Sequence, residues 1–170
     1  MKLRPRKSTP SGSPTPPPVL PDIGVTNQQQ TLEIPAARVR GLVRFVLAAE
    51  QREGRVEITF VDDARIAQIH QQFLGVSGPT DVITFPIDDG DEDALRGDEL
   101  PLPLLGEIVV STDTAKRQAP DFGNEPLLEV LLYVVHGVLH LVGYDDRAPA
   151  DRQRMESRQS ELLAAWRAQE

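Results

Sequence analysis

The hydrophobic positions of this chain repeat with the periods of β-strands and α-helices from about residue 24 onward. Val56, Ile58 and Phe60 alternate with polar neighbours, and this period of two predicts a half-buried strand over 55–62. Short apolar segments predict further strands at 24–34, 80–86 and 106–111. We therefore expect a small mixed sheet of about four strands, which is within the usual size of sheets.

Helical spacing of apolar residues predicts a second set of elements that pack on this sheet. These helices span about 35–52, 63–73, 112–119, 125–142 and 148–168. The first helix begins at Pro35, and its apolar face is expected to cover the sheet. That face consists of Val39, Leu42, Val43, Val46 and Leu47. The apolar stripe of the last helix consists of Met155, Leu162, Leu163 and Trp166.

The chain of 170 residues has the length of one domain, with two segments of distinct composition. Residues 1–21 hold 7 of the 15 prolines among Ser, Thr, Lys and Arg, which predicts a disordered tail. Residues 87–104 hold 7 acidic residues and 1 arginine, which predicts a solvated acidic loop inserted into the domain. The single globular domain is expected to span 22–170.

Composition excludes several kinds of site and partner. The chain has 0 cysteines, so a metal must be held by His, Asp or Glu. A formal charge of -8 argues against indiscriminate binding of nucleic acid, and we expect no DNA partner. No apolar signal segment follows the basic N-terminus, and the apolar stretch 127–142 is short and interrupted by Glu129 and two histidines. We therefore expect a cytoplasmic protein without a membrane partner.

Two of the 3 histidines lie in the segment HGVLHLVGYDD at 136–146. His136 and His140 are four residues apart on a predicted helix, so their side chains lie on one face and can bind one ion. Gly143 permits the positive φ that ends a helix, after which the chain can turn back and offer Asp146 as a third ligand. Three protein ligands leave a position for water, as in catalytic zinc sites.

A structural interpretation of the same residues is also possible. Paired histidines on a buried helix can be core residues, with Gly143 an ordinary cap and Asp145 or Asp146 the cap of the next helix. The positions of the glycine and the acid favour a zincin-like metal site on a central helix. A zinc protease of the H-E-x-x-H type is excluded, because Gly137 occupies the place of the general-base glutamate.

The segment at 136–146 resembles the signature HGxLHLxGYDH of the YbeY family of bacterial endoribonucleases. Three other segments resemble that family in the same order along the chain. GPTDVITFP (78–86) is similar to its PTDVLSFP strand, GEIVVS (106–111) to its GDIVIS strand, and 155–163 to its last helix, M-x-x-x-Q-E-x-x-L. The likeness covers about residues 55–165.

The resemblance implies an α+β fold and a single-strand-specific, metal-dependent endoribonuclease. It implies roles in 16S ribosomal RNA 3′-end maturation and ribosome quality control, with ribosomal RNA and ribosomal subunits as partners. One Zn²⁺ ion is expected on His136, His140 and Asp146. Two positions depart from the family: Asp146 replaces a histidine but is still a zinc donor, and Leu74 replaces an arginine suited to phosphate.

No general base is evident from the sequence. Asp81 and Asp145 lie beside the motifs and are the candidate catalytic proton acceptors, with capping or turn formation as the alternative for both. Two rival functions stay open. A non-catalytic, metal-stabilised ribosome assembly factor is favoured by Leu74 and by the absence of an evident base, and a metallohydrolase of another substrate is favoured by the acidic composition.

Overall fold

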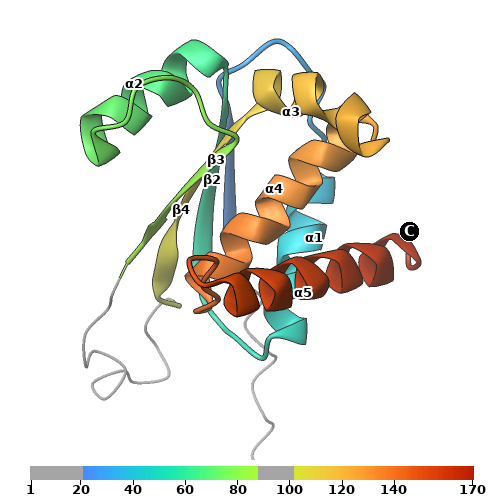
Figure 1. Cartoon of the computed structure of the whole chain (residues 1–170). Coiled ribbons are helices and arrows are strands. Elements are labelled where there is room, and N and C mark those ends of the chain that lie inside the picture. The colour runs from blue at the N-terminus through green and yellow to red at the C-terminus, as the bar shows by residue number, and fades with distance from the viewer. Residues whose placement is uncertain (1–20, 88–101) are drawn as a thin grey trace, which may run out of the picture.

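The computed structural model describes residues 21–87 and 102–170 (Figure 1). The predicted tail, except for Pro21, and positions 88–101 of the predicted acidic loop lie outside the described residues. The elements in chain order are β1 (Ile23–Asn27), α1 (Ala36–Ala49), β2 (Arg55–Val61), α2 (Asp63–Leu74), β3 (Val82–Pro86), β4 (Leu104–Ser111), α3 (Thr112–Gln118), the 3-10 helix η2 (Ala119–Phe122), α4 (Pro126–Leu141) and α5 (Pro149–Arg167).

The sheet has four strands in the order β1-β2-β4-β3. β1, β2 and β4 are mutually parallel, whereas β3 pairs antiparallel with β4, so the sheet is mixed as predicted. The central pair is in register with Ile58 opposite Ile108. Alternate side chains of a strand point to opposite faces, so both strands contribute to an apolar layer on each side of the sheet. The predicted α+β class is confirmed.

Helices cover the two faces of the sheet unequally. α1 and α4 pack on one face, with α5 packed against these two helices, and α2 lies on the other face (Figure 1). The larger core includes the predicted apolar face of α1 and the stripe of α5, and Phe60, Ile108 and Leu139 are fully buried within it. The smaller core beneath α2 consists of Val61, Ile66, Ile83 and Val109. α4 therefore runs between the sheet and α5, and its C-terminal end lies near the start of α5 (Figure 1).

The first strand is shorter than the predicted 24–34, because the chain leaves the sheet after Asn27. The side chain of Gln29, only 7% exposed, accepts hydrogen bonds from the backbone amides of Thr31 and Leu32 at 2.6 and 2.9 Å. Its amide group donates to the Leu32 carbonyl at 2.8 Å. The buried Gln29 side chain thus stabilises a turn, because it pairs with backbone groups that would otherwise pair with a neighbouring strand.

A polar network joins the start of α2 to the start of α3. Asp62 caps α2 by accepting from the Arg65 amide, whereas Asp63 accepts from the Ser111 hydroxyl at 2.6 Å, the Thr114 hydroxyl at 2.7 Å and the Arg117 guanidinium at 2.8 Å. Burial of Asp63 raises the pKa of its carboxyl, but the three donors together outweigh burial and lower the pKa below its ordinary value. The ionised form is therefore the one that stabilises the fold.

We expect Asp63→Asn to lower the free energy of unfolding at neutral pH by about 1–2 kcal/mol, since three donors lose their charged acceptor. The wild-type carboxyl has a lower pKa when folded than when unfolded, so its contribution is complete above the unfolded pKa of about 4 and is lost as pH falls through the folded value. Urea unfolding at pH 3–7 should show the difference between wild type and variant shrinking below about pH 4. Asp62→Asn is the matched control, because asparagine caps a helix as well as aspartate. The ionised Asp63 would not be the stabilising form if the difference in free energy of unfolding between wild type and Asp63→Asn stayed constant with pH, or if Asp62→Asn produced the same difference.

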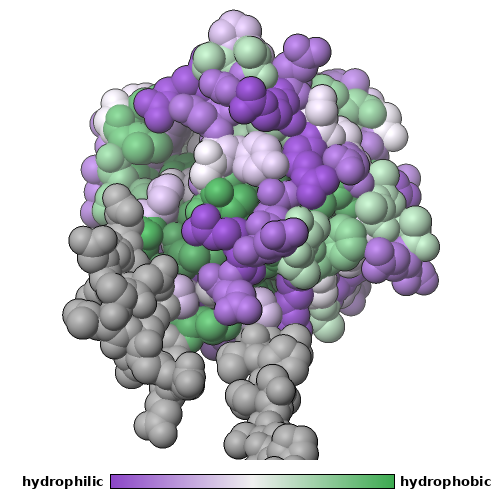
Figure 2. All heavy atoms as spheres, turned by 90° about the horizontal axis from the view of Figure 1, so that it is seen from below, coloured by the Kyte–Doolittle hydropathy of each residue, from purple (hydrophilic) through white to green (hydrophobic). Residues whose placement is uncertain are grey.

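Across residues 21–87 and 102–170, no helix combines the length and the apolarity that a bilayer crossing requires. Seen from below, polar and apolar side chains are intermixed over the visible face, without a regular pattern (Figure 2).

Candidate metal centre

The two histidines of the motif lie on the last turns of α4. Their side chains project to the same side, and the Nε2 atoms of His136 and His140 are 3.1 Å apart. The imidazole planes are nearly perpendicular, at 81°. Both side chains are half-buried, with 26% and 24% of their surfaces exposed, so the imidazoles are held by the protein and remain partly accessible to solvent.

The chain returns to these histidines because a glycine follows the end of α4. Gly143 adopts a φ of +106°, which L side chains rarely adopt, and a Cβ at this position would meet nothing within 4 Å. The glycine is therefore needed for its backbone conformation and not for space. The Tyr144 amide donates to the Leu139 carbonyl at 3.0 Å and closes the helix end. Asp146 then faces back, with Oδ2 3.6 Å from His136 Nε2 and 3.4 Å from His140 Nε2.

The spacing of these three atoms is close to that of three ligands around a single small cation. Ligand atoms bound tetrahedrally at the usual zinc distances of about 2.0–2.2 Å are about 3.3–3.6 Å from one another. The observed separations are 3.1, 3.4 and 3.6 Å. His136, His140 and Asp146 also form the one His, Cys, Asp or Glu group with ligand spacing among residues 21–87 and 102–170. A possible metal-binding His-His-Asp group is thus present on and after α4.

In both histidines, the hydrogen bond made by Nδ1 favours metal binding by Nε2. His140 Nδ1 lies 3.1 Å from the Tyr144 carbonyl, which can only accept, so Nδ1 carries the hydrogen and Nε2 presents a lone pair. His136 Nδ1 lies 3.0 Å from Gln159 Oε1, which gives that ring the same tautomer. Burial lowers the pKa of His136, and His140 lowers it further. Two lone pairs and a carboxylate therefore meet at a point that a cation would stabilise.

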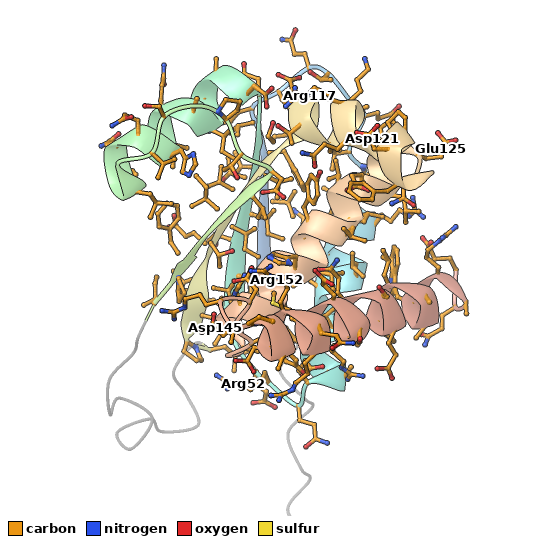
Figure 3. The ribbon with its side chains drawn as sticks, viewed as in Figure 1. Arg52, Arg117, Asp121, Glu125, Asp145 and Arg152 are labelled. Atoms are coloured by element: carbon orange, nitrogen blue, oxygen red, sulfur yellow. The ribbon has the colours of Figure 1, made fainter. Side chains whose placement is uncertain are left out.

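The two candidate proton acceptors lie outside this group. Oδ1 of Asp81 accepts from the Thr80 hydroxyl at 3.0 Å and the Val82 amide at 2.8 Å, as in a turn at the start of β3. Asp145 is bound by Arg147, whose Nε is 3.1 Å from both carboxylate oxygens, and this contact lowers the pKa of Asp145. Figure 3 shows Asp145 on the connection between α4 and α5. Their catalytic role stays a prediction.

Comparison with known proteins places the chain in a family. The family model described as Endoribonuclease YbeY matches residues 24–167. The chain belongs to this family. Proteins named Endoribonuclease YbeY from Nocardioides sp. (strain ATCC BAA-499 / JS614) and Moorella thermoacetica are 39% and 36% identical to it, over 77% and 84% of this chain and 89% and 96% of theirs. YbeY membership supports an endoribonuclease role, and therefore a hydrolase role, for this chain.

A solved structure agrees with the YbeY assignment at the level of the fold. The solution structure of TM1509 from Thermotoga maritima is similar with a TM-score of 0.56 and 25% sequence identity, covering 86% of this chain and 93% of that one. The α+β fold and the resemblance to YbeY are therefore both confirmed.

The sequence pattern does not reveal the α5 residues that contact the candidate ligands. Gln159 contacts His136 from α5. Arg152, which is labelled in Figure 3, lies on the same helix and donates to the Asp146 carbonyl at 3.1 Å. Gln159 is 8% exposed, which is rare for a glutamine, but burial cannot be recognised in the sequence of an otherwise polar helix. The available signal was its place in the 155–163 segment that resembles the last YbeY helix.

Proposed function

We propose that this protein is a zinc-dependent endoribonuclease that cleaves single-stranded RNA, with roles in 16S ribosomal RNA 3′-end maturation and ribosome quality control. YbeY membership supports the reaction class. The observation that carries the zinc proposal is the convergence of two Nε2 lone pairs and the Asp146 carboxylate within 4.8 Å of one another. Ribosomal RNA and ribosomal subunits are the proposed partners, in the cytoplasm.

In this proposal His136, His140 and Asp146 hold Zn²⁺, which would supply Lewis-acid activation of a phosphodiester and of water. Roughly a quarter of each imidazole and 40% of the Asp146 side chain are exposed, so a phosphate group can approach from solvent. Asp81 and Asp145 are the proposed proton acceptors. Asp81 is the better placed of the two, because only its Oδ1 is used in the turn, whereas Arg147 contacts both oxygens of Asp145.

The direct test of this function is cleavage by the zinc-loaded full chain. The substrates are a single-stranded RNA that spans the 3′ end of precursor 16S ribosomal RNA and the same RNA annealed to its complement. We expect cleavage of the single strand, little cleavage of the duplex, and loss of cleavage after chelation. Equal cleavage of both substrates would contradict single-strand specificity. Hydrolysis of a small phosphodiester without any cleavage of RNA would favour a metallohydrolase of another substrate.

One position favours a second candidate, a metal-stabilised ribosome assembly factor that binds without cleaving. Leu74, where the family resemblance leads one to expect arginine, is the last residue of α2 and is 54% exposed. An exposed leucine cannot donate hydrogen bonds to phosphate. Binding of ribosomal subunits by the zinc-loaded protein, with the RNA left intact, would support this candidate over the endoribonuclease.

Leu74→Arg should raise RNA affinity and cleavage, because it adds a guanidinium suited to bidentate contact with phosphate. We expect RNA affinity to rise about 5- to 20-fold at low salt, and the gain to shrink as salt increases. Fluorescence anisotropy with single-stranded RNA measures the affinity. Phe73→Arg is the matched control, since the neighbouring Phe73 is 62% exposed and its replacement adds the same charge. An equal gain in both variants would show a nonspecific charge effect.

A further inference from the structure

Helix α5 supplies none of the three candidate ligands. Its side chains nevertheless contact these residues, directly or through one or two other residues. Gln159 Oε1 lies 3.0 Å from His136 Nδ1, the ring nitrogen that points away from the other two ligands. Arg152 Nε donates to the main-chain carbonyl of Asp146 at 3.1 Å. Arg152 and Gln159 are two helical turns apart and so lie on the same face of α5. In Figure 3, Arg152 points from α5 towards the end of α4.

His140 is connected to the same helix by a longer route. Its Nδ1 faces the carbonyl of Tyr144, whose hydroxyl donates to Glu50 Oε2 at 3.1 Å. Glu50 Oε1 accepts from Arg158 Nε at 2.7 Å, and the side chains of Arg158 and Glu50 are only 26% and 12% exposed. Arg158 directly precedes Gln159. One turn of α5 therefore acts on both imidazoles, directly on His136 and through Glu50 and Tyr144 on His140.

We propose that α5 is the positioning element of the metal centre and that Gln159 is its principal positioning residue. The inference rests on the proposed metal site. An imidazole that is held by a hydrogen bond at Nδ1 presents Nε2 in one tautomer and one orientation, so less freedom is lost when a cation binds. Gln159 is well suited to this because its side chain is buried and its carbonyl oxygen accepts the hydrogen bond from Nδ1.

The test is zinc binding by the full chain and two variants of Gln159. Gln159→Leu removes the acceptor, and Gln159→Glu keeps an acceptor at the same distance along the side chain. Gln153→Leu is the matched control, because Gln153 is an exposed glutamine on the same helix. Competition with a chromophoric chelator measures the Zn²⁺ dissociation constant, and the Co²⁺ absorption spectrum reports coordination geometry. Thermal unfolding in chelator measures the stability of the metal-free fold.

We expect Gln159→Leu to weaken Zn²⁺ binding by about 10- to 100-fold and to change the Co²⁺ spectrum, with Gln159→Glu and Gln153→Leu binding as wild type does. If Gln159 only packs α5 against α4, Gln159→Leu will change the metal-free melting temperature and leave the dissociation constant and spectrum unaltered, which overturns the inference. Failure of Gln159→Glu to restore binding also overturns it. A wild-type chain that binds no Zn²⁺ instead overturns the proposed metal site itself, so the two failures are distinguishable.

Discussion

His140→Ala should abolish both metal binding and RNA cleavage while leaving the chain folded. The variant removes one of three ligands, so its effect on zinc affinity should exceed the loss of about 100-fold that removal of an outer-shell partner can cause. The free energy of unfolding without metal should fall only slightly, because the His140 side chain is partly exposed. It makes one hydrogen bond to the protein besides its contacts with His136 and Asp146. That bond is worth about 0.5–1.5 kcal/mol. Zinc titration and single-turnover cleavage of RNA measure the two losses.

The control for this variant is the free energy of unfolding in the presence of chelator. Wild type and His140→Ala should agree within about 1.5 kcal/mol there, and differ much more with Zn²⁺ present, since the ion stabilises only the folded chain that binds it. RNA cleavage that survives in the folded variant would show that the histidine pair is not the catalytic centre.

Gly137→Glu should destabilise the protein severely and should not produce a protease, although it restores the H-E-x-x-H pattern. A Cβ at Gly137 would lie 2.7, 2.9 and 3.2 Å from three side-chain atoms of Ile108, which is fully buried in the sheet. Gly137 is thus one point of close approach between α4 and β4. A buried glutamate without partners should cost more than about 3 kcal/mol. Chemical denaturation of the metal-free protein measures the loss.

Alanine scanning of two helical glycines separates packing from helix propensity. Gly137→Ala adds only the Cβ, so overpacking of about 1–3 kcal/mol should equal or exceed the helix-propensity gain of about 1 kcal/mol. Gly41→Ala in α1 is the matched control, because a Cβ there meets nothing within 4 Å. This variant should therefore show only the stability gained from helix propensity. If the two alanine variants gained equal stability, the close contact between α4 and β4 would be refuted.

The hydrophobic pattern predicted most of the fold because the strands and helices each bury a regular face. Val56, Ile58 and Phe60 are buried in β2, in agreement with their alternation. The end of β1 could not be predicted, because Gln29 competes for backbone hydrogen bonds only once its side chain is buried. The order of strands, with β3 antiparallel at the edge beside β4, depends on contacts between distant segments and has no local signal.

The candidate site was predictable to the extent that it is local. His136 and His140 share a helical face, and Gly143 turns the chain, so ligand spacing could be inferred within an 11-residue segment. The residues from other helices that contact this segment could not be inferred in this way. Gln159 is 23 residues from His136 along the chain, and Glu50 is 108 residues from Arg158. Only the packing of α1, α4 and α5 brings these groups together.

Elemental analysis of the purified full chain, alongside His136→Ala and Asp146→Ala, tests the convergence of the three ligands most directly. Each protein is loaded with Zn²⁺ and dialysed against metal-free buffer. We expect one zinc per wild-type chain and far less in both variants, because each loses one corner of a triangle whose edges are 3.1, 3.4 and 3.6 Å. A wild-type chain that retains no zinc, or variants that retain as much as wild type, would contradict a metal centre at the end of α4.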